Sequence, residues 1–169
     1  MIEAKYYDRH AEINQDSYIE KVRSSKEETQ RFQAVIDLIP TGCSTLLDIG
    51  CGSGVFLELL REKRTEINSI GLERSDVLVK MIQNHLNVNV IKGSADQLPF
   101  KTGRFDVVTS MEVLEHLPYE IYQNALAEIE RVGSPIVIIT VPFQEHRRFV
   151  SCPECKCKFS PIYHLRTFD

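Results

Sequence analysis

Short apolar runs alternate with amphipathic segments through the middle of the chain. Apolar runs bounded by turn residues predict strands at residues 45–49, 69–72, 88–92, 105–110 and 134–141. Apolar residues at helical spacing predict helices between them, at residues 55–63, 76–84 and 119–131. Strands that alternate with helices predict an α/β fold with a doubly wound, mostly parallel sheet and helices on both faces. The run at residues 136–139 lacks alternation, which is typical of a strand buried on both faces.

The two ends of the chain differ from this alternating core. Residues 1–40 are polar and helix-prone, and Pro40 and Gly42 end the segment. Their apolar stripe follows the helical spacing i, i+3, i+4 and i+7: Phe32, Val35, Ile36 and Ile39. We interpret residues 1–40 as an N-terminal helical cap, residues 41–142 as the core domain, and residues 143–169 as a Cys/His-rich tail.

Composition is that of an ordinary globular domain. The chain has 169 residues, of which 43% are hydrophobic and 26% charged. The net charge of −4 and the lack of a dense basic run give no sign of a nucleic-acid partner. The polar N-terminus does not look like a signal peptide, and no apolar run reaches the ~18 residues of a membrane span. Five cysteines in such a chain favour a reducing compartment, so we expect a cytoplasmic protein.

A glycine-rich turn joins the first predicted strand to the helix that follows it. It runs from Asp48 to Gly54 with glycine at alternate positions, and such a turn lets the backbone approach a nucleotide-like ligand closely. A dinucleotide fingerprint, G-x-G-x-x-G, would need glycine in place of Val55, which disfavours an NAD-dependent oxidoreductase. The pattern D-x-G-x-G-x-G resembles the first motif of class I S-adenosylmethionine-dependent methyltransferases, which have a Rossmann-like fold. A carboxylate at the strand end suits the positive sulfonium and ammonium groups of that cofactor.

Two later segments fit the same resemblance. Glu73 follows the second predicted strand, where a carboxylate can accept hydrogen bonds from both ribose hydroxyls. The segment around Asp96 and Gln97 resembles the one whose acid meets the adenine amino group. A solvated strand-end charge remains the alternative for Glu73, and a turn or helix cap for Asp96. The resemblance implies this cofactor-binding set: Asp48, Gly50, Cys51, Gly52, Gly54, Glu73, Arg74, Asp96, Gln97, Met111 and Glu112.

Residues 105–118 resemble the fourth-strand motif of small-molecule methyltransferases, in which the strand runs into a loop beside the methyl donor. Ligands of open α/β sheets bind outside the carboxyl ends of the strands, so Met111 and Glu112 should line the cofactor. His116 is the candidate general base, because the usual pKa of histidine lies near neutrality. The alternative is that His116 caps the loop or packs against the next helix.

The resemblance covers residues 41–142. It implies transfer of a methyl group from S-adenosylmethionine to a small molecule, or to a saccharide or lipid-linked precursor. The family sheet has two more strands after the fifth, and the tail of this chain lacks their pattern, so we expect those strands to be missing or truncated. A non-catalytic S-adenosylmethionine-binding or scaffold protein is the alternative function.

The tail carries separate chemistry. Cys152 and Cys155 have the C-x2-C spacing that points two thiolates at one tetrahedral ion. Cys157 and His164 would complete a structural zinc site, and His146 competes with Cys157 for one position. Free reduced thiols or a C-x2-C redox pair are the alternatives. A tail ordered by zinc would cover the strand ends as a lid, or contact a partner subunit such as the second copy of a homodimer.

Overall fold

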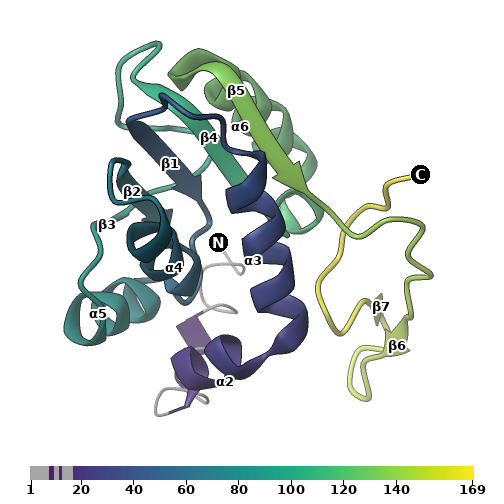
Figure 1. Cartoon of the computed structure of the whole chain (residues 1–169). Helices are drawn as coiled ribbons and strands as arrows, with labels where there is room; N and C mark the ends of the chain where they lie inside the picture. The colour runs from purple at the N-terminus through teal and green to yellow at the C-terminus, as the bar shows by residue number, and fades with distance from the viewer. Residues whose placement is uncertain (1–7, 10–11, 13–16) are drawn as a thin grey trace.

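The computed structural model describes residues 8–9, 12 and 17–169 (Figure 1). Most of the segment before residue 17, which we assigned to the helical cap, lies outside the described residues. The core is a parallel five-stranded sheet in the order β3-β2-β1-β4-β5. Its strands are β1 (Thr45–Ile49), β2 (Asn68–Glu73), β3 (Val90–Lys92), β4 (Phe105–Met111) and β5 (Gly133–Thr140). The predicted parallel α/β sheet is confirmed.

Helices cover both faces of this sheet, as predicted (Figure 1). One face packs against α2 (Tyr18–Ser24), α3 (Lys26–Leu38), α4 (Val55–Lys63) and α5 (Asp76–His85). The other face packs against α6 (Tyr119–Val132), which follows the short helix η1 (Leu114–His116). Successive strand residues point to opposite faces, so Leu46 is buried with the first group of helices and Leu47 with the second. The central strands β1 and β4 are therefore buried between two apolar layers.

Serine residues mark the starts of two helices. The Ser25 hydroxyl accepts a hydrogen bond from the backbone of Glu28 at the start of α3, and Ser75 caps α5 in the same way. Helix α3 ends at Leu38, two residues before Pro40, because proline disfavours a helical residue before it. The predicted helix on this apolar stripe is confirmed.

Strand β5 departs from the prediction of burial on both faces. Val137 is 43% exposed and Ile139 is 39% exposed. Strand β5 lies at the edge of the sheet, and no element in the described part of the chain covers these two side chains. The apolar run at residues 136–139 therefore includes one face of β5 that stays exposed in this structure.

The tail turns back onto the core after β5. Strands β6 (Val150–Ser151) and β7 (Lys158–Phe159) form a small antiparallel hairpin. Beyond it, the backbone N–H of Leu165 donates to the carbonyl oxygen of Glu115 at 2.7 Å. The Arg166 guanidinium donates to the carbonyl oxygens of Leu114 and Leu117. These bonds hold the end of the tail against the loop that follows β4.

None of the helices in the described ranges has the length and apolar character needed to cross a bilayer.

Candidate functional site

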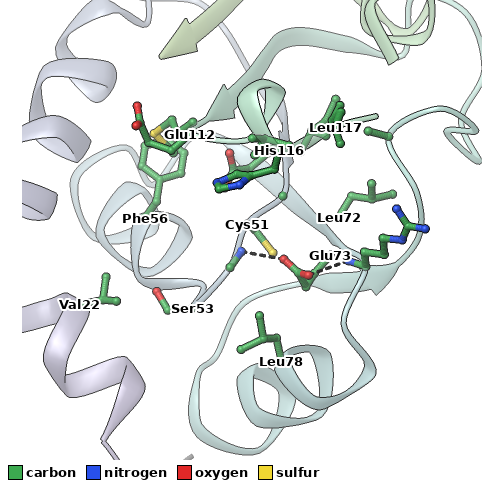
Figure 2. A pocket seen from close by; sticks show the side chains of 18 of the residues that line it. Val22, Cys51, Ser53, Phe56, Leu72, Glu73, Leu78, Glu112, His116 and Leu117 are labelled. Atoms are coloured by element: carbon green, nitrogen blue, oxygen red, sulfur yellow. Dashed lines mark hydrogen bonds between the residues drawn. The ribbon is translucent and has the colours of Figure 1, made fainter. Parts of the chain in front are cut away.

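A cavity of about 340 Å³ opens at the carboxyl ends of β1, β2 and β4 (Figure 2). Its walls come from the glycine turn after β1, the end of β2, the turn after β3 and the loop after β4. Helices α2 and α3 contribute the opposite side through Tyr18, Arg31 and Phe32. The volume lies in the range of pockets that hold small molecules, and the position is where open α/β sheets bind ligands.

The glycine turn is held by the neighbouring strand. The N–H groups of Gly50 and Cys51 both donate to the carbonyl oxygen of Leu72, at 2.8 and 3.1 Å. Gly50 has a φ of 73°, and a Cβ at this position would lie 2.5 Å from a side-chain carbon of Val113. Left-handed φ and this contact both require glycine here, so the turn presents bare backbone to the cavity.

Gly54 plays a different part from the one predicted. It is the N-cap of α4 and does not line the cavity. A Cβ at Gly54 would approach Ile82 and Leu86 at 3.1 Å, so this glycine serves the packing of α4 against α5.

Glu73 is buried at the wall of the cavity, with only 7% of its surface exposed. Its carboxylate accepts three backbone hydrogen bonds, from Gly52 at 3.0 Å and from Arg74 and Ser75 at 2.8 Å. Figure 2 shows the first two of these bonds. Burial raises the pKa of Glu73 above its usual value, although these bonds oppose the shift. This environment does not fit the alternative of a solvated charge at a strand end. A carboxylate has about four acceptor sites, so capacity remains for a ligand.

Asp48 is a second buried carboxylate in the same wall. One oxygen, Oδ1, accepts from the Thr109 hydroxyl at 2.8 Å, and Oδ2 has no hydrogen-bond partner within the described residues. Burial raises the pKa of Asp48 to about 7. Burial likewise raises the pKa of the neighbouring Cys51 thiol, which is therefore neutral. A cationic ligand would favour the ionised form of Asp48.

The turn after β3 meets the cavity through different residues from those predicted. Gly93, Ser94 and Ala95 line it, and Asp96 and Gln97 do not. The Asp96 carboxylate accepts from the Ser94 hydroxyl, and the backbone N–H of Gln97 donates to the carbonyl oxygen of Ser94. Asp96 thus supports the turn, which is the alternative that the sequence left open.

Met111 at the end of β4 and Glu112 in the loop after it line the cavity, as expected. Glu112 has a φ of 53°, and its Oε1 accepts from the Thr140 hydroxyl at 2.9 Å. The same oxygen lies 3.8 Å from an Arg31 guanidinium nitrogen of α3. The helical spacing of the N-terminal segment predicted α3, but it carried no signal that Arg31 would meet this loop.

His116 also lines the cavity, at the end of η1. Its Nδ1 lies 3.2 Å from the carbonyl oxygen of Tyr163, which can only accept, so Nδ1 carries the hydrogen. Burial lowers the pKa of His116 to about 4, and the ring is neutral at neutral pH. The near-neutral pKa assumed for a general base is therefore wrong for this environment. The His164 ring packs edge-on against His116, with centroids 4.8 Å apart.

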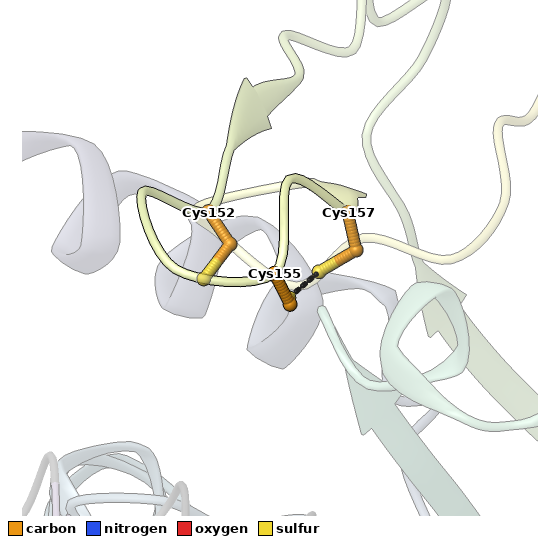
Figure 3. Close-up of side chains that lie close together, drawn as sticks. All are labelled: Cys152, Cys155 and Cys157. Atoms are coloured by element: carbon orange, nitrogen blue, oxygen red, sulfur yellow. Dashed lines mark hydrogen bonds between the residues drawn. The ribbon is translucent and has the colours of Figure 1, made fainter.

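The three tail cysteines come together in the β6–β7 hairpin (Figure 3). The sulfurs of Cys152, Cys155 and Cys157 all lie within 4.8 Å of one another, and those of Cys155 and Cys157 are 3.1 Å apart. The backbone N–H of Cys152 donates to the carbonyl oxygen of Cys157 at 2.8 Å and closes the turn. This cluster matches the predicted grouping of the cysteines.

His164 does not join the cysteines, contrary to the predicted set of four ligands. Its Nδ1 lies 2.6 Å from a carboxylate oxygen of Glu145, and its ring packs against His116. The hydrogen bonds of Leu165 and Arg166 to the loop after β4 hold His164 on the core side of the tail. Nor does His146, the competing residue, belong to a metal-ligand cluster in the described chain.

Comparison with known proteins points to one family. Residues 47–139 match the family described as methyltransferase domain. A ubiquinone biosynthesis O-methyltransferase from Nitrosospira multiformis is 32% identical over 103 aligned residues, and the match covers 57% of this chain and 42% of that protein. The enzyme of the same name from Pseudoalteromonas translucida is 31% identical over 100 aligned residues, and the match covers 56% of this chain and 42% of that protein. The chain thus spans less than half the length of these curated relatives.

Solved structures agree with this match. A S-adenosylmethionine-dependent methyltransferase from Archaeoglobus fulgidus is 31% identical, with a TM-score of 0.61 over 74% of this chain and 57% of that one. A S-adenosylmethionine-dependent methyltransferase from Thermotoga maritima has a TM-score of 0.64 at 23% identity, over 83% of this chain and 62% of that one. The second similarity concerns the fold alone.

Proposed function

Because the chain belongs to the methyltransferase domain family, which matches residues 47–139, we propose that it transfers the methyl group of S-adenosylmethionine to an oxygen atom of a small molecule. The observation that carries the cofactor half of this proposal is the buried Glu73 carboxylate beside the glycine turn. The names of the curated relatives, which are O-methyltransferases, support the acceptor half.

The cofactor-binding residues follow from the cavity wall. Three backbone N–H groups orient the Glu73 carboxylate, which would accept hydrogen bonds from the two ribose hydroxyls. Ionised Asp48 would attract the positive ammonium and sulfonium groups. We assign cofactor contacts to the predicted residues that line the cavity, and add two residues of the turn after β3: Asp48, Gly50, Cys51, Gly52, Glu73, Arg74, Ser94, Ala95, Met111 and Glu112.

Methyl transfer does not require a covalent bond between the protein and the methyl group. The methyl carbon passes from sulfur to the acceptor by in-line displacement, and holding the two in a near-attack arrangement supplies most of the acceleration. The glycine turn and Glu73 would fix the donor, while the loop from Met111 to His116 borders the space for the acceptor.

Calorimetry on the whole chain tests the cofactor. We expect S-adenosylhomocysteine, the demethylated product, to bind with one equivalent per chain and NAD to give no heat. Tight NAD binding without S-adenosylhomocysteine binding would refute the proposal. Methyl transfer from labelled S-adenosylmethionine to a panel of small phenols and alcohols then tests catalysis, and binding without any transfer would favour the non-catalytic alternative.

We propose further that the three cysteines supply three of the four ligands of a structural zinc site. Thiolates about 2.3 Å from a tetrahedral zinc ion lie about 3.8 Å from one another, and the three sulfurs need small shifts to reach that spacing. The hairpin is short and exposed, so metal binding would supply most of its folding energy. A reducing compartment such as the cytoplasm would keep these thiols available.

Cobalt substitution checks this second proposal. Reconstituting the metal-free chain with Co²⁺ should give the sulfur-to-cobalt charge-transfer absorption that thiolate ligands produce, and Cys155→Ser should abolish it and expose the tail to protease. Cys43→Ala, at a buried cysteine outside the cluster, is the matched control and should keep both properties. A parent chain without the absorption would contradict the assignment.

A further inference from the structure

A second group of ligand-type side chains meets beside the cavity, at a place that methyl-donor binding does not use. It consists of Glu115, His116 and His164, and one ligand atom from each lies within 4.8 Å of the other two. Glu115 and His116 come from η1, whereas His164 comes from the tail. The His116 ring also lines the cavity, where Figure 2 shows it between Glu112 and Leu117.

Glu115 is the buried acid of the group, with 1% of its surface exposed. Neither carboxylate oxygen has a hydrogen-bond partner within the described residues. The nearby Arg166 guanidinium donates to the carbonyl oxygens of Leu114 and Leu117 instead. A buried carboxylate without donors is unfavourable unless it takes up a proton, is paired with a charge or coordinates a cation. The two unpartnered oxygens of Glu115 are therefore acceptors that a cation bound here would satisfy.

Both imidazoles have a hydrogen-bonding pattern that is common among metal ligands. His116 presents Nδ1 to the carbonyl oxygen of Tyr163 at 3.2 Å, and His164 presents Nδ1 to the Glu145 carboxylate at 2.6 Å. Because these oxygens accept, each Nδ1 carries the hydrogen and each Nε2 carries the lone pair. The Nε2 atom of His116 lies 3.9 Å from Oε1 of Glu115. A histidine that ligates through one nitrogen while the other donates to a carboxylate or carbonyl is the common arrangement in metal sites.

We propose that Glu115, His116 and His164 bind a divalent transition-metal ion, with Glu145 as the residue that orients His164. Two imidazoles and one carboxylate suit Mn²⁺, Fe²⁺, Co²⁺ or Zn²⁺, and three protein ligands leave coordination positions open. Since His116 lines the cavity, those positions would face a ligand there. If the proposed function holds, the ion would bind the acceptor hydroxyl and ease the loss of its proton to water.

The same placement explains why His164 stands apart from the cysteines. The tail brings it back to η1 through the bond of Leu165 to Glu115, so the tail contributes one ligand to a site whose other two ligands lie in the core. Metal binding would therefore fasten the end of the tail to the loop after β4.

Titration of the whole metal-free chain with Mn²⁺ tests the proposal, because Mn²⁺ prefers oxygen and nitrogen ligands to the thiolates of the hairpin. The paramagnetic resonance signal of free Mn²⁺ should fall as one equivalent binds. His164→Ala and Glu115→Gln should each weaken Mn²⁺ binding by about tenfold or more, and Glu145→Gln by about tenfold. His146→Ala, at an exposed histidine of the same tail, is the matched control and should leave the affinity unchanged.

The melting temperature of the metal-free variants separates loss of the site from loss of the fold. Glu115→Gln removes an uncompensated buried acid, so it should melt no lower than the parent without metal, and only the parent should gain stability when Mn²⁺ is added. A parent that leaves free Mn²⁺ unchanged, or a His164→Ala variant with parental affinity, would overturn the proposal. Neither the Mn²⁺ titration nor the melting temperature depends on S-adenosylhomocysteine binding. Failure of the metal-site proposal can therefore be distinguished from failure of the methyltransferase proposal.

Discussion

Replacing Glu73 with alanine is expected to raise the dissociation constant for S-adenosylhomocysteine by about a hundredfold or more. Hydrogen bonds to a charged group contribute about 1.5–3 kcal/mol each, and the proposed role of Glu73 gives it two of them, to the ribose hydroxyls. The lower end of that range, about 3 kcal/mol in total, already corresponds to about two factors of ten in affinity. Calorimetric titration at fixed pH and salt measures the change directly.

The same substitution has a structural effect that must be separated from binding. Glu73 accepts hydrogen bonds from Gly52, Arg74 and Ser75, and alanine would leave these N–H groups to water. Glu73→Gln keeps the side-chain shape and one acceptor, so it should fold better than the alanine variant and still bind weakly. Asp96→Ala is the matched control, since Asp96 lies outside the cavity lining, and we expect a change below about twofold. A parental dissociation constant for Glu73→Ala would show that the acid only braces the turn.

The core of the fold follows from patterns that are local in sequence. Uniform apolar runs placed β1 and β4 within a residue of their observed bounds, because strands of a parallel sheet are buried by helices on both faces. The same argument failed for β5, whose Val137 and Ile139 are exposed. An apolar run indicates that both faces of a strand are apolar. It does not indicate which element, if any, packs against each face, because that depends on the tertiary structure.

Sequence reasoning about the site succeeded at strand ends and failed in turns and in the tail. Glu73 and Met111 line the cavity because a residue at the carboxyl end of a parallel strand has a direction set by the sheet. Asp96 lies in a turn, where neighbouring residues point in different directions, so an error of one residue changes which side chain faces the cavity. Ser94 and Ala95 face it instead of Asp96. The position of His164 depends on how the tail returns to η1, which no local pattern encodes.

Asp48→Asn is expected to stabilise the ligand-free protein at pH 8 by about 1–3 kcal/mol. Burial raises the pKa of Asp48 from 3.8 to about 7, so between these pH values the folded chain holds a proton that the unfolded chain has released. The contribution of Asp48 to the free energy of unfolding is therefore largest below about pH 4 and declines as the pH rises towards 7. At about 1.4 kcal/mol per pKa unit, the rise of about three units corresponds to about 4 kcal/mol, and the unpaired amide of asparagine offsets about 1–3 kcal/mol of it.

Asp106 offers the matched control for this prediction, because its pKa moves in the opposite direction. Its carboxylate accepts hydrogen bonds from the backbone and hydroxyl groups of Ser44 and Thr45, which lower its pKa to about 2. Its stabilisation is present above about pH 4 and is lost as the pH falls towards 2, so Asp106→Asn should destabilise the chain at pH 8. Denaturant unfolding of both variants at pH 5 and pH 8 measures the sign of each change in the free energy of unfolding.

If Asp48→Asn also weakens S-adenosylhomocysteine binding while it stabilises the fold, the buried charge is kept for ligand binding at the expense of stability. An Asp48→Asn variant that is less stable than the parent at pH 8 would show that the carboxylate is ionised and compensated without any ligand.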